Sequence, residues 1–131
     1  MKSTIVIYGH ESELTKADAK HIAYHIGAQT TCPRHIDDAM LSNVENFILC
    51  LPSFAAEKAE NEWREYISTF RNKNIKGKYF ILYIPSGSPS SPMLGELRFV
   101  LSQRGARILS QIIRPQHYTI DEWISAVSPS L

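Results

Sequence analysis

Apolar runs and amphipathic stretches alternate along the chain. The apolar runs, rich in β-branched and aromatic residues, predict about five strands. They cover Thr4 to Tyr8, Gln29 to Cys32, Phe47 to Leu51, Tyr79 to Ile84 and Ile108 to Ile113. Between these runs, apolar residues recur with the period of one helix face. The helical stripes are Ala19, Ile22, Ala23 and Ile26; Trp63, Tyr66, Ile67 and Phe70; Leu94, Leu97 and Leu101; and Ile120, Trp123, Ile124 and Val127. The alternation predicts an α/β protein whose parallel sheet has helices on both faces.

The ends of the predicted helices carry recognisable signals. Gly27, Gly77 and Gly105 each follow a periodic segment, where a left-handed residue commonly ends a helix. Ser91 precedes Pro92, which suits the first position of a helix. We therefore expect a helix to begin at Pro92.

Length and charge restrict the possible functions. At 131 residues the chain fits a single domain, 1–131, and its net charge of +1 supplies no field to collect nucleic acid or an anionic membrane. No apolar run approaches the ~20 residues that a bilayer span needs. Cys32 and Cys50 have no C-x-x-C spacing, so we interpret them as buried thiols. We expect a soluble, cytoplasmic protein without nucleic-acid, membrane or metal partners.

The loop after the first strand is placed where a phosphate would bind. A strand, a tight turn and a helix follow one another here, so the unpaired N–H groups of the first helical turn point beyond the sheet and favour an anion. Ser12 and Thr15 could each donate a hydroxyl to a phosphate oxygen. Glu11 and Glu13 oppose this, because a carboxylate ~6 Å from a phosphate costs roughly 2–3 kcal/mol.

The same hydroxyls have a second interpretation. Ser12 or Thr15 could simply cap the helix, with Thr15 and Asp18 at the spacing of a capping box. The sequence leaves both readings of this loop open.

Ligands of open parallel sheets bind beyond the carboxyl ends of the strands, where the strand order reverses. This rule selects Gly9 to Thr15, Pro52 to Glu60 and Pro85 to Pro92. These three loops, on these strands, resemble those of flavodoxins, small electron carriers that bind FMN. The resemblance covers nearly the whole chain and implies a flavodoxin-like doubly wound sheet with strand order 2-1-3-4-5.

The first loop matches the flavodoxin pattern in part. The family's Ser/Thr-x-Thr-Gly-x-Thr, which wraps the FMN phosphate, falls on residues 10–15. Ser12 and Thr15 match, whereas His10 replaces the first hydroxyl and Glu13 replaces the glycine. The resemblance implies that the FMN phosphate lies against the backbone N–H groups of Glu11 to Thr15.

The second loop resembles the family more closely than the third. Phe54 stands where flavodoxins often place an aromatic residue against the flavin ring, and an offset aromatic pair adds roughly 0.5–1.5 kcal/mol. An aromatic residue packed under the loop is the alternative. In the third loop no aromatic residue precedes Phe99. The cofactor-binding residues implied for FMN are His10, Glu11, Ser12, Glu13, Leu14, Thr15, Pro52, Ser53, Phe54, Ala55, Ser86, Gly87 and Ser88.

The resemblance implies an FMN-binding electron-transfer protein that meets redox partner proteins. The alternative is a module of the same fold that lacks FMN and serves in protein interaction or regulation, which the altered first and third loops favour.

Other chemistry has less support. His21 and His25 lie one helical turn apart without a third metal ligand. Asp37 and Asp38 do not end a strand as a phosphorelay receiver requires, and no nucleophile motif surrounds Ser53.

Overall fold

The computed structural model describes residues 4–9, 13–32, 35–51, 57–71, 73–84 and 92–113. The described strands pair side by side and parallel in the order β2-β1-β3-β4-β5. Their bounds are β1 Thr4–Tyr8, β2 Gln29–Thr31, β3 Asn46–Cys50, β4 Tyr79–Ile84 and β5 Arg107–Ile113. The predicted α/β class, parallel sheet and strand order are therefore confirmed.

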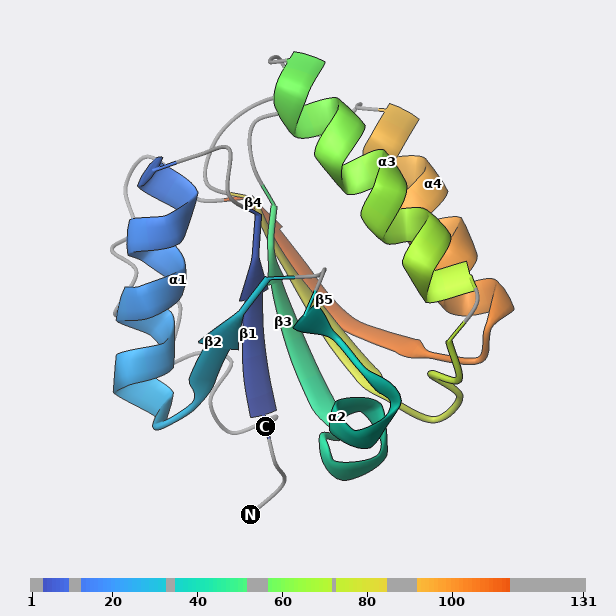
Figure 1. Cartoon of the computed structure of the whole chain (residues 1–131), viewed down its shortest axis with the longest axis horizontal. Coiled ribbons are helices and arrows are strands. Elements are labelled where there is room, and N and C mark those ends of the chain that lie inside the picture. Colours follow the sequence, from blue (N-terminus) through green and yellow to red (C-terminus); the bar gives the residue numbers. More distant parts are fainter. Residues whose placement is uncertain are drawn as a thin grey trace.

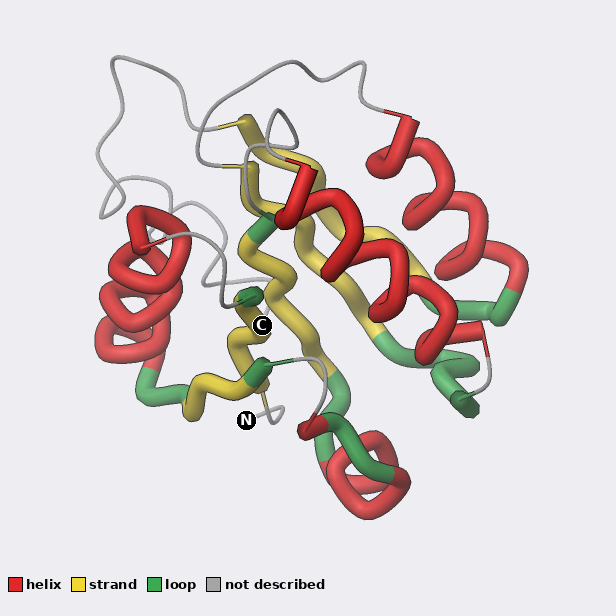
Figure 2. The backbone as a smooth tube through the Cα atoms, turned by 45° about the horizontal axis from the view of Figure 1, so that its top comes forward, coloured by secondary structure: helices red, strands yellow, loops and turns green. Residues whose placement is uncertain are grey.

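Helices cover both faces of the sheet (Figures 1 and 2). The helix α1, Glu13–Ile26, lies on one face, and α3, Glu57–Arg71, and α4, Pro92–Gln103, lie together on the other. A short helix, α2, Asp38–Asn43, sits near the start of β3. Crossovers to both sides of a parallel sheet define a doubly wound architecture.

The core forms one cluster on each face of the sheet, because alternate strand residues point to opposite faces. The cluster under α3 and α4 contains Phe47, Phe80 and Trp63. The smaller cluster under α1 contains Val6 and Ile48. The predicted helical stripes of α1, α3 and α4 lie in these clusters or pack against them, so each faces the sheet as expected.

Several boundaries refine the sequence prediction. The third strand was expected at Phe47 to Leu51 but starts one residue earlier and ends at Cys50. Leu51 is buried nonetheless, and its N–H donates to the carbonyl of Tyr83 at 2.8 Å. The predicted start of α4 at Pro92 is confirmed. The stripe from Ile120 to Val127 lies outside the described residues.

The predicted left-handed conformation is confirmed at all three glycines, with φ of 69° at Gly27, 79° at Gly77 and 83° at Gly105. Gly27 and Gly105 follow the ends of α1 and α4, but the helix end expected at Gly77 is wrong, because α3 ends at Arg71 and Gly77 lies in a turn before β4. At Gly105 an added Cβ would also lie 3.1 Å from Cγ of Lys76. A side chain there meets both backbone strain and a close neighbour.

Gly105 and Gly95 offer a matched pair of substitutions. Gly105→Ala should lower the free energy of unfolding by about 1–2 kcal/mol, the cost of a left-handed conformation for a residue with a Cβ. Gly95 lies inside α4 with open space around it, so Gly95→Ala should raise stability by about 0.5–1 kcal/mol. Urea unfolding of both variants checks this prediction, and effects of the same sign would contradict it.

Candidate functional site

The carboxyl ends of the parallel strands lie along one edge of the sheet, called here the carboxyl edge. In Figure 1 this edge is at the top, where α1, α3 and α4 each begin. Strands β1 and β3 are neighbours, yet β1 is followed along the chain by β2 on its other side. The strand order therefore reverses between β1 and β3, and this is where a doubly wound sheet binds its ligands.

The first predicted loop connects β1 to α1 at this reversal point. Strand β1 ends at Tyr8, Gly9 is buried, and α1 begins at Glu13. Glu13, Leu14 and Thr15 thus form the first turn of α1, whose N–H groups have no partner within the helix. His10, Glu11 and Ser12 lie outside the described residues.

The proposed capping box of Thr15 and Asp18 is wrong. A capping residue stands just before the first helical residue, and α1 begins at Glu13, before Thr15. Asp18 is only 5% exposed and lies between the helix and the sheet. Its carboxylate therefore has a different role from the one the spacing indicated.

The second and third loops follow β3 and β4 at the same edge. Their candidate residues, Pro52, Ser53, Phe54, Ala55, Ser86, Gly87 and Ser88, lie outside the described residues. The residues immediately before the second loop are described: Cys50 and Leu51 are fully buried. Trp63, which the sequence places in a helical apolar stripe, is also fully buried, and its ring packs against that of Tyr66 with centroids 5.5 Å apart.

A buried polar cluster lies beneath the carboxyl edge on the α1 face, and sequence reasoning did not identify it. Tyr8 pairs with Cys50 and Cys50 pairs with Tyr83, so the three side chains form a row across β1, β3 and β4. Above this row, the Tyr83 hydroxyl donates to Oδ2 of Asp18 at 3.1 Å. We call Tyr8, Cys50 and Tyr83, together with Asp18 above them on α1, the polar row.

Burial and the neighbouring Asp18 both act on the thiol of Cys50. Complete burial raises the pKa of the Cys50 thiol far above its ordinary value, and the negative charge of Asp18 raises this pKa further. A thiol with so high a pKa stays protonated and is a poor nucleophile or metal ligand. Cys32 is buried as well, and both cysteines are free. The expectation of buried thiols is therefore confirmed.

The other residues considered for chemistry lie at the surface. His21 and His25 are exposed on α1, with ring centroids 4.6 Å apart. Asp37 caps α2 by accepting the N–H of Met40 at 2.8 Å, and Asp38 pairs with Lys73 at 3.2 Å. In the described part of the chain, no three His, Cys, Asp or Glu residues group as metal ligands do. None of its helices is long and apolar enough to cross a membrane.

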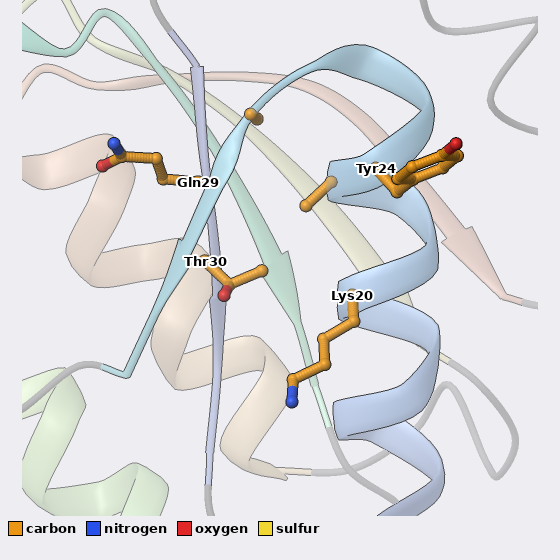
Figure 3. Close-up of a pocket in the computed structure, with 6 residues that line it drawn as sticks. Lys20, Tyr24, Gln29 and Thr30 are labelled. Carbon is orange, nitrogen blue, oxygen red and sulfur yellow. The ribbon is translucent and has the colours of Figure 1, made fainter.

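An open groove of about 500 Å³ runs between α1 and the edge strand β2. Lys20 and Tyr24 contribute from α1, and Gln29 and Thr30 from β2 (Figure 3). Lys20 and Thr30 extend into the space between the two elements, whereas the ring of Tyr24 turns away from it. The groove lies beside the sheet, away from the order reversal between β1 and β3.

Comparisons with known proteins agree with the topology. No family model matches the sequence, and no curated protein matches it either. Solved structures do match: oxidised flavodoxin 2 from Bacillus cereus has a TM-score of 0.73 at 14% identity, over 98% of this chain and 99% of that one. Fusobacterium nucleatum flavodoxin, solved bound to flavin mononucleotide, has a TM-score of 0.70 at 15% identity, over 100% and 99%.

A more distant source gives the same result. A flavodoxin from the domain Archaea has a TM-score of 0.60 at 19% identity, over 95% of this chain and 92% of that one. At these identities the likeness concerns the fold rather than the ligand. The chain has a flavodoxin-like fold.

Proposed function

We propose that this protein binds FMN at the carboxyl edge and carries electrons between redox partner proteins in the cytoplasm. One observation carries the proposal: α1 begins directly beyond β1, at the point between β1 and β3 where the strand order reverses. A helix N-terminus at such a point is a ready site for a phosphate group. The full-length likeness to flavodoxins, one of them solved with flavin mononucleotide, supports the same ligand.

The proposed site assigns a role to each loop. Backbone N–H groups of residues 11–15 hold the phosphate, with the hydroxyls of Ser12 and Thr15 as further donors. Phe54 lies against the flavin ring, and the third loop borders it. The remaining proposed contacts are His10, Pro52, Ser53, Ala55, Ser86, Gly87 and Ser88. The bound flavin would supply the redox chemistry, while the protein binds and orients it.

The described residues lie where FMN would need its phosphate donors, but the negative charge of Glu13 is unfavourable for a phosphate. The first turn of α1 offers its N–H groups at the order reversal. Glu13 is the first residue of that turn, and a carboxylate near the positive end of the helix dipole would compete there with the proposed phosphate. FMN therefore binds more weakly than it would to a neutral loop.

A second function has specific support. The same Glu13, with Glu11 two residues before it in sequence, favours a flavodoxin-fold module that does not bind FMN and instead contacts another protein. Large side chains are available for such contacts: Tyr24 on α1 is 84% exposed and Phe99 on α4 is 63% exposed. We retain this as the alternative.

Nuclear magnetic resonance separates the two functions by location. We expect FMN, added to the isotope-labelled protein, to shift the amide signals of Glu13, Leu14 and Thr15 more than those of Glu45 and Asn46 at the opposite edge of the sheet. Adenosine monophosphate, which has a phosphate but no flavin, is the control for phosphate binding alone. Shifts absent from the first turn of α1 at saturating FMN would contradict the proposed site.

A further inference from the structure

The polar row lies at the carboxyl edge of the sheet, directly before the three loops of the proposed site. Tyr8 is the last residue of β1 and Cys50 the last of β3, and Tyr83 stands next to the end of β4. Each strand leads directly into one of the three loops. Asp18 belongs to the second turn of α1, one turn beyond the N–H groups of Glu13 to Thr15. One cluster therefore joins the bases of all three loops.

Asp18 is unusual within the described chain. It is the only buried charged side chain there, at 5% exposure, and it faces an otherwise apolar interface of α1 with Ala19, Ile22 and Ala23. A buried carboxylate loses its hydration, and hydrogen bonds must replace it. An apolar residue of similar size would avoid that cost. Its presence at this edge of the sheet points to a role other than packing.

The hydrogen bond to Tyr83 gives that role a physical form. Apolar contacts between a helix and a sheet tolerate small slides, whereas a hydrogen bond restricts both the distance and the angle between its donor and acceptor. Tyr83 is 1% exposed, and its hydroxyl donates to Oδ2 of Asp18 across the interface between α1 and the sheet. The Tyr83 carbonyl also accepts the N–H of Leu51 at 2.8 Å. Tyr83 thus connects α1 to the ends of both β3 and β4.

We propose that Asp18 and Tyr83 are positioning residues, whose hydrogen bond fixes the first turn of α1 relative to the ends of β3 and β4. Its relevance to ligand binding rests on the proposed function, because the first turn of α1 is where the FMN phosphate would be held. The bond itself needs no ligand. It arranges the first turn before FMN arrives, so that less ordering remains to oppose binding.

The test uses substitutions that separate loss of the hydrogen bond from loss of side-chain volume. Tyr83→Phe removes the donor, Asp18→Ala removes the acceptor, and Asp18→Asn removes the charge but keeps an oxygen that can accept from Tyr83. Tyr79→Phe is the matched control. Tyr79 lies on the same face of β4 at its other end, paired with Asn46, so this variant loses the same hydroxyl far from the carboxyl edge.

The first readout is amide hydrogen exchange without FMN. We expect Tyr83→Phe and Asp18→Ala to speed exchange at residues 16–18, whose N–H groups bond to carbonyls at the start of the helix, relative to residues 19–26. Asp18→Asn and Tyr79→Phe should leave this ratio near its original value. Rescue by asparagine distinguishes a positioned hydrogen bond from a general loss of stability. If Asp18→Ala does not fold, Tyr83→Phe and Asp18→Asn still decide the matter.

The second readout is the affinity for FMN, from quenching of flavin fluorescence. Tyr83→Phe and Asp18→Ala should each weaken it about 3- to 10-fold, and the double variant should be no weaker than either, since both remove one interaction. Unchanged exchange at residues 16–18 in Tyr83→Phe, or an Asp18→Asn variant as impaired as Asp18→Ala, would overturn the positioning role. Failure of the unsubstituted protein to bind FMN would overturn the proposed function instead, while hydrogen exchange would still decide the positioning role.

Discussion

Replacement of Ile48 by aspartate is expected to unfold the protein. Ile48 is fully buried in the central strand β3, beside Val6 of β1 and Ile81 of β4 on the α1 face. An unpaired carboxylate in this apolar cluster costs more than about 5 kcal/mol, which is comparable with the whole stability of many single domains. Circular dichroism and the dispersion of amide signals should show a largely unfolded chain at neutral pH.

Two control variants separate the effect of burying a charge from the effect of substituting Ile48 or of adding a charge to a strand. Ile48→Val removes one methylene and should cost only about 0.5–1.5 kcal/mol. Leu109→Asp introduces the same charge on the edge strand β5, at a residue that is 41% exposed, and the protein should remain folded. A folded Ile48→Asp variant of ordinary stability would contradict the position of β3 at the centre of the sheet.

Replacement of Glu13 by glycine is expected to tighten FMN binding by about 5- to 150-fold. The substitution removes a carboxylate from the first residue of α1 and restores the glycine at this position of the flavodoxin pattern. After solvent screening, a unit charge ~6 Å from the phosphate weakens the binding free energy by roughly 1–3 kcal/mol. Fluorescence titration measures the gain. It should shrink as salt is added, since exposed charges are screened within ~10 Å at moderate ionic strength.

Glu13→Gln isolates the charge from the freedom of the backbone. It should recover most of the gain if repulsion dominates, and little of it if close approach of the phosphate requires glycine. Glu45→Gln removes a carboxylate at the amino edge of the sheet, where the carbonyl of Glu45 accepts from Tyr79 at 2.9 Å, and should leave the affinity unchanged. An unchanged affinity in a folded Glu13→Gly variant would count against a phosphate at this turn.

The sheet could be predicted from the sequence because its signals are local and mutually consistent. Strands β1 and β4 begin and end where their apolar runs do, and the glycines after α1 and α4 have the expected positive φ. The end of β3 was less certain. Leu51 continues the apolar run and is buried, but only the pairing with β4 decides that the strand ends at Cys50.

Features that depend on distant contacts escaped prediction. The helix α2 is short and has only one buried residue, Leu41, so it produces no periodic stripe. Its clearest sign was Asp37, a typical helix-capping residue. Asp18 draws attention in the sequence only through its spacing from Thr15, which fits a capping box as one of two open interpretations, whereas its partner Tyr83 is far away in sequence. An acidic residue within an otherwise apolar helix face was the available signal.

The candidate site was predictable in location more than in chemistry. The order reversal between β1 and β3 follows from the topology, and topology follows from the pattern of elements. Whether the loops bind a flavin depends on side chains such as Ser12, Phe54 and Ser88, which lie outside the described residues. The hydroxyl and aromatic residues among them favour FMN, whereas the carboxylates of Glu11 and Glu13 oppose it. Pattern alone does not weigh these charges against the N–H groups of α1.

Calorimetric titration of the ligand-free protein with FMN tests the central claim most directly, with riboflavin and FAD titrated in parallel. Riboflavin lacks the phosphate, and FAD adds a bulky nucleotide to it. We expect saturable heat and quenched flavin fluorescence with FMN, and weaker binding of riboflavin and FAD, because the proposed site at the first turn of α1 would recognise a terminal phosphate. Absence of saturable binding at high micromolar FMN, in protein shown to be folded, would contradict the account and favour the FMN-free interaction module.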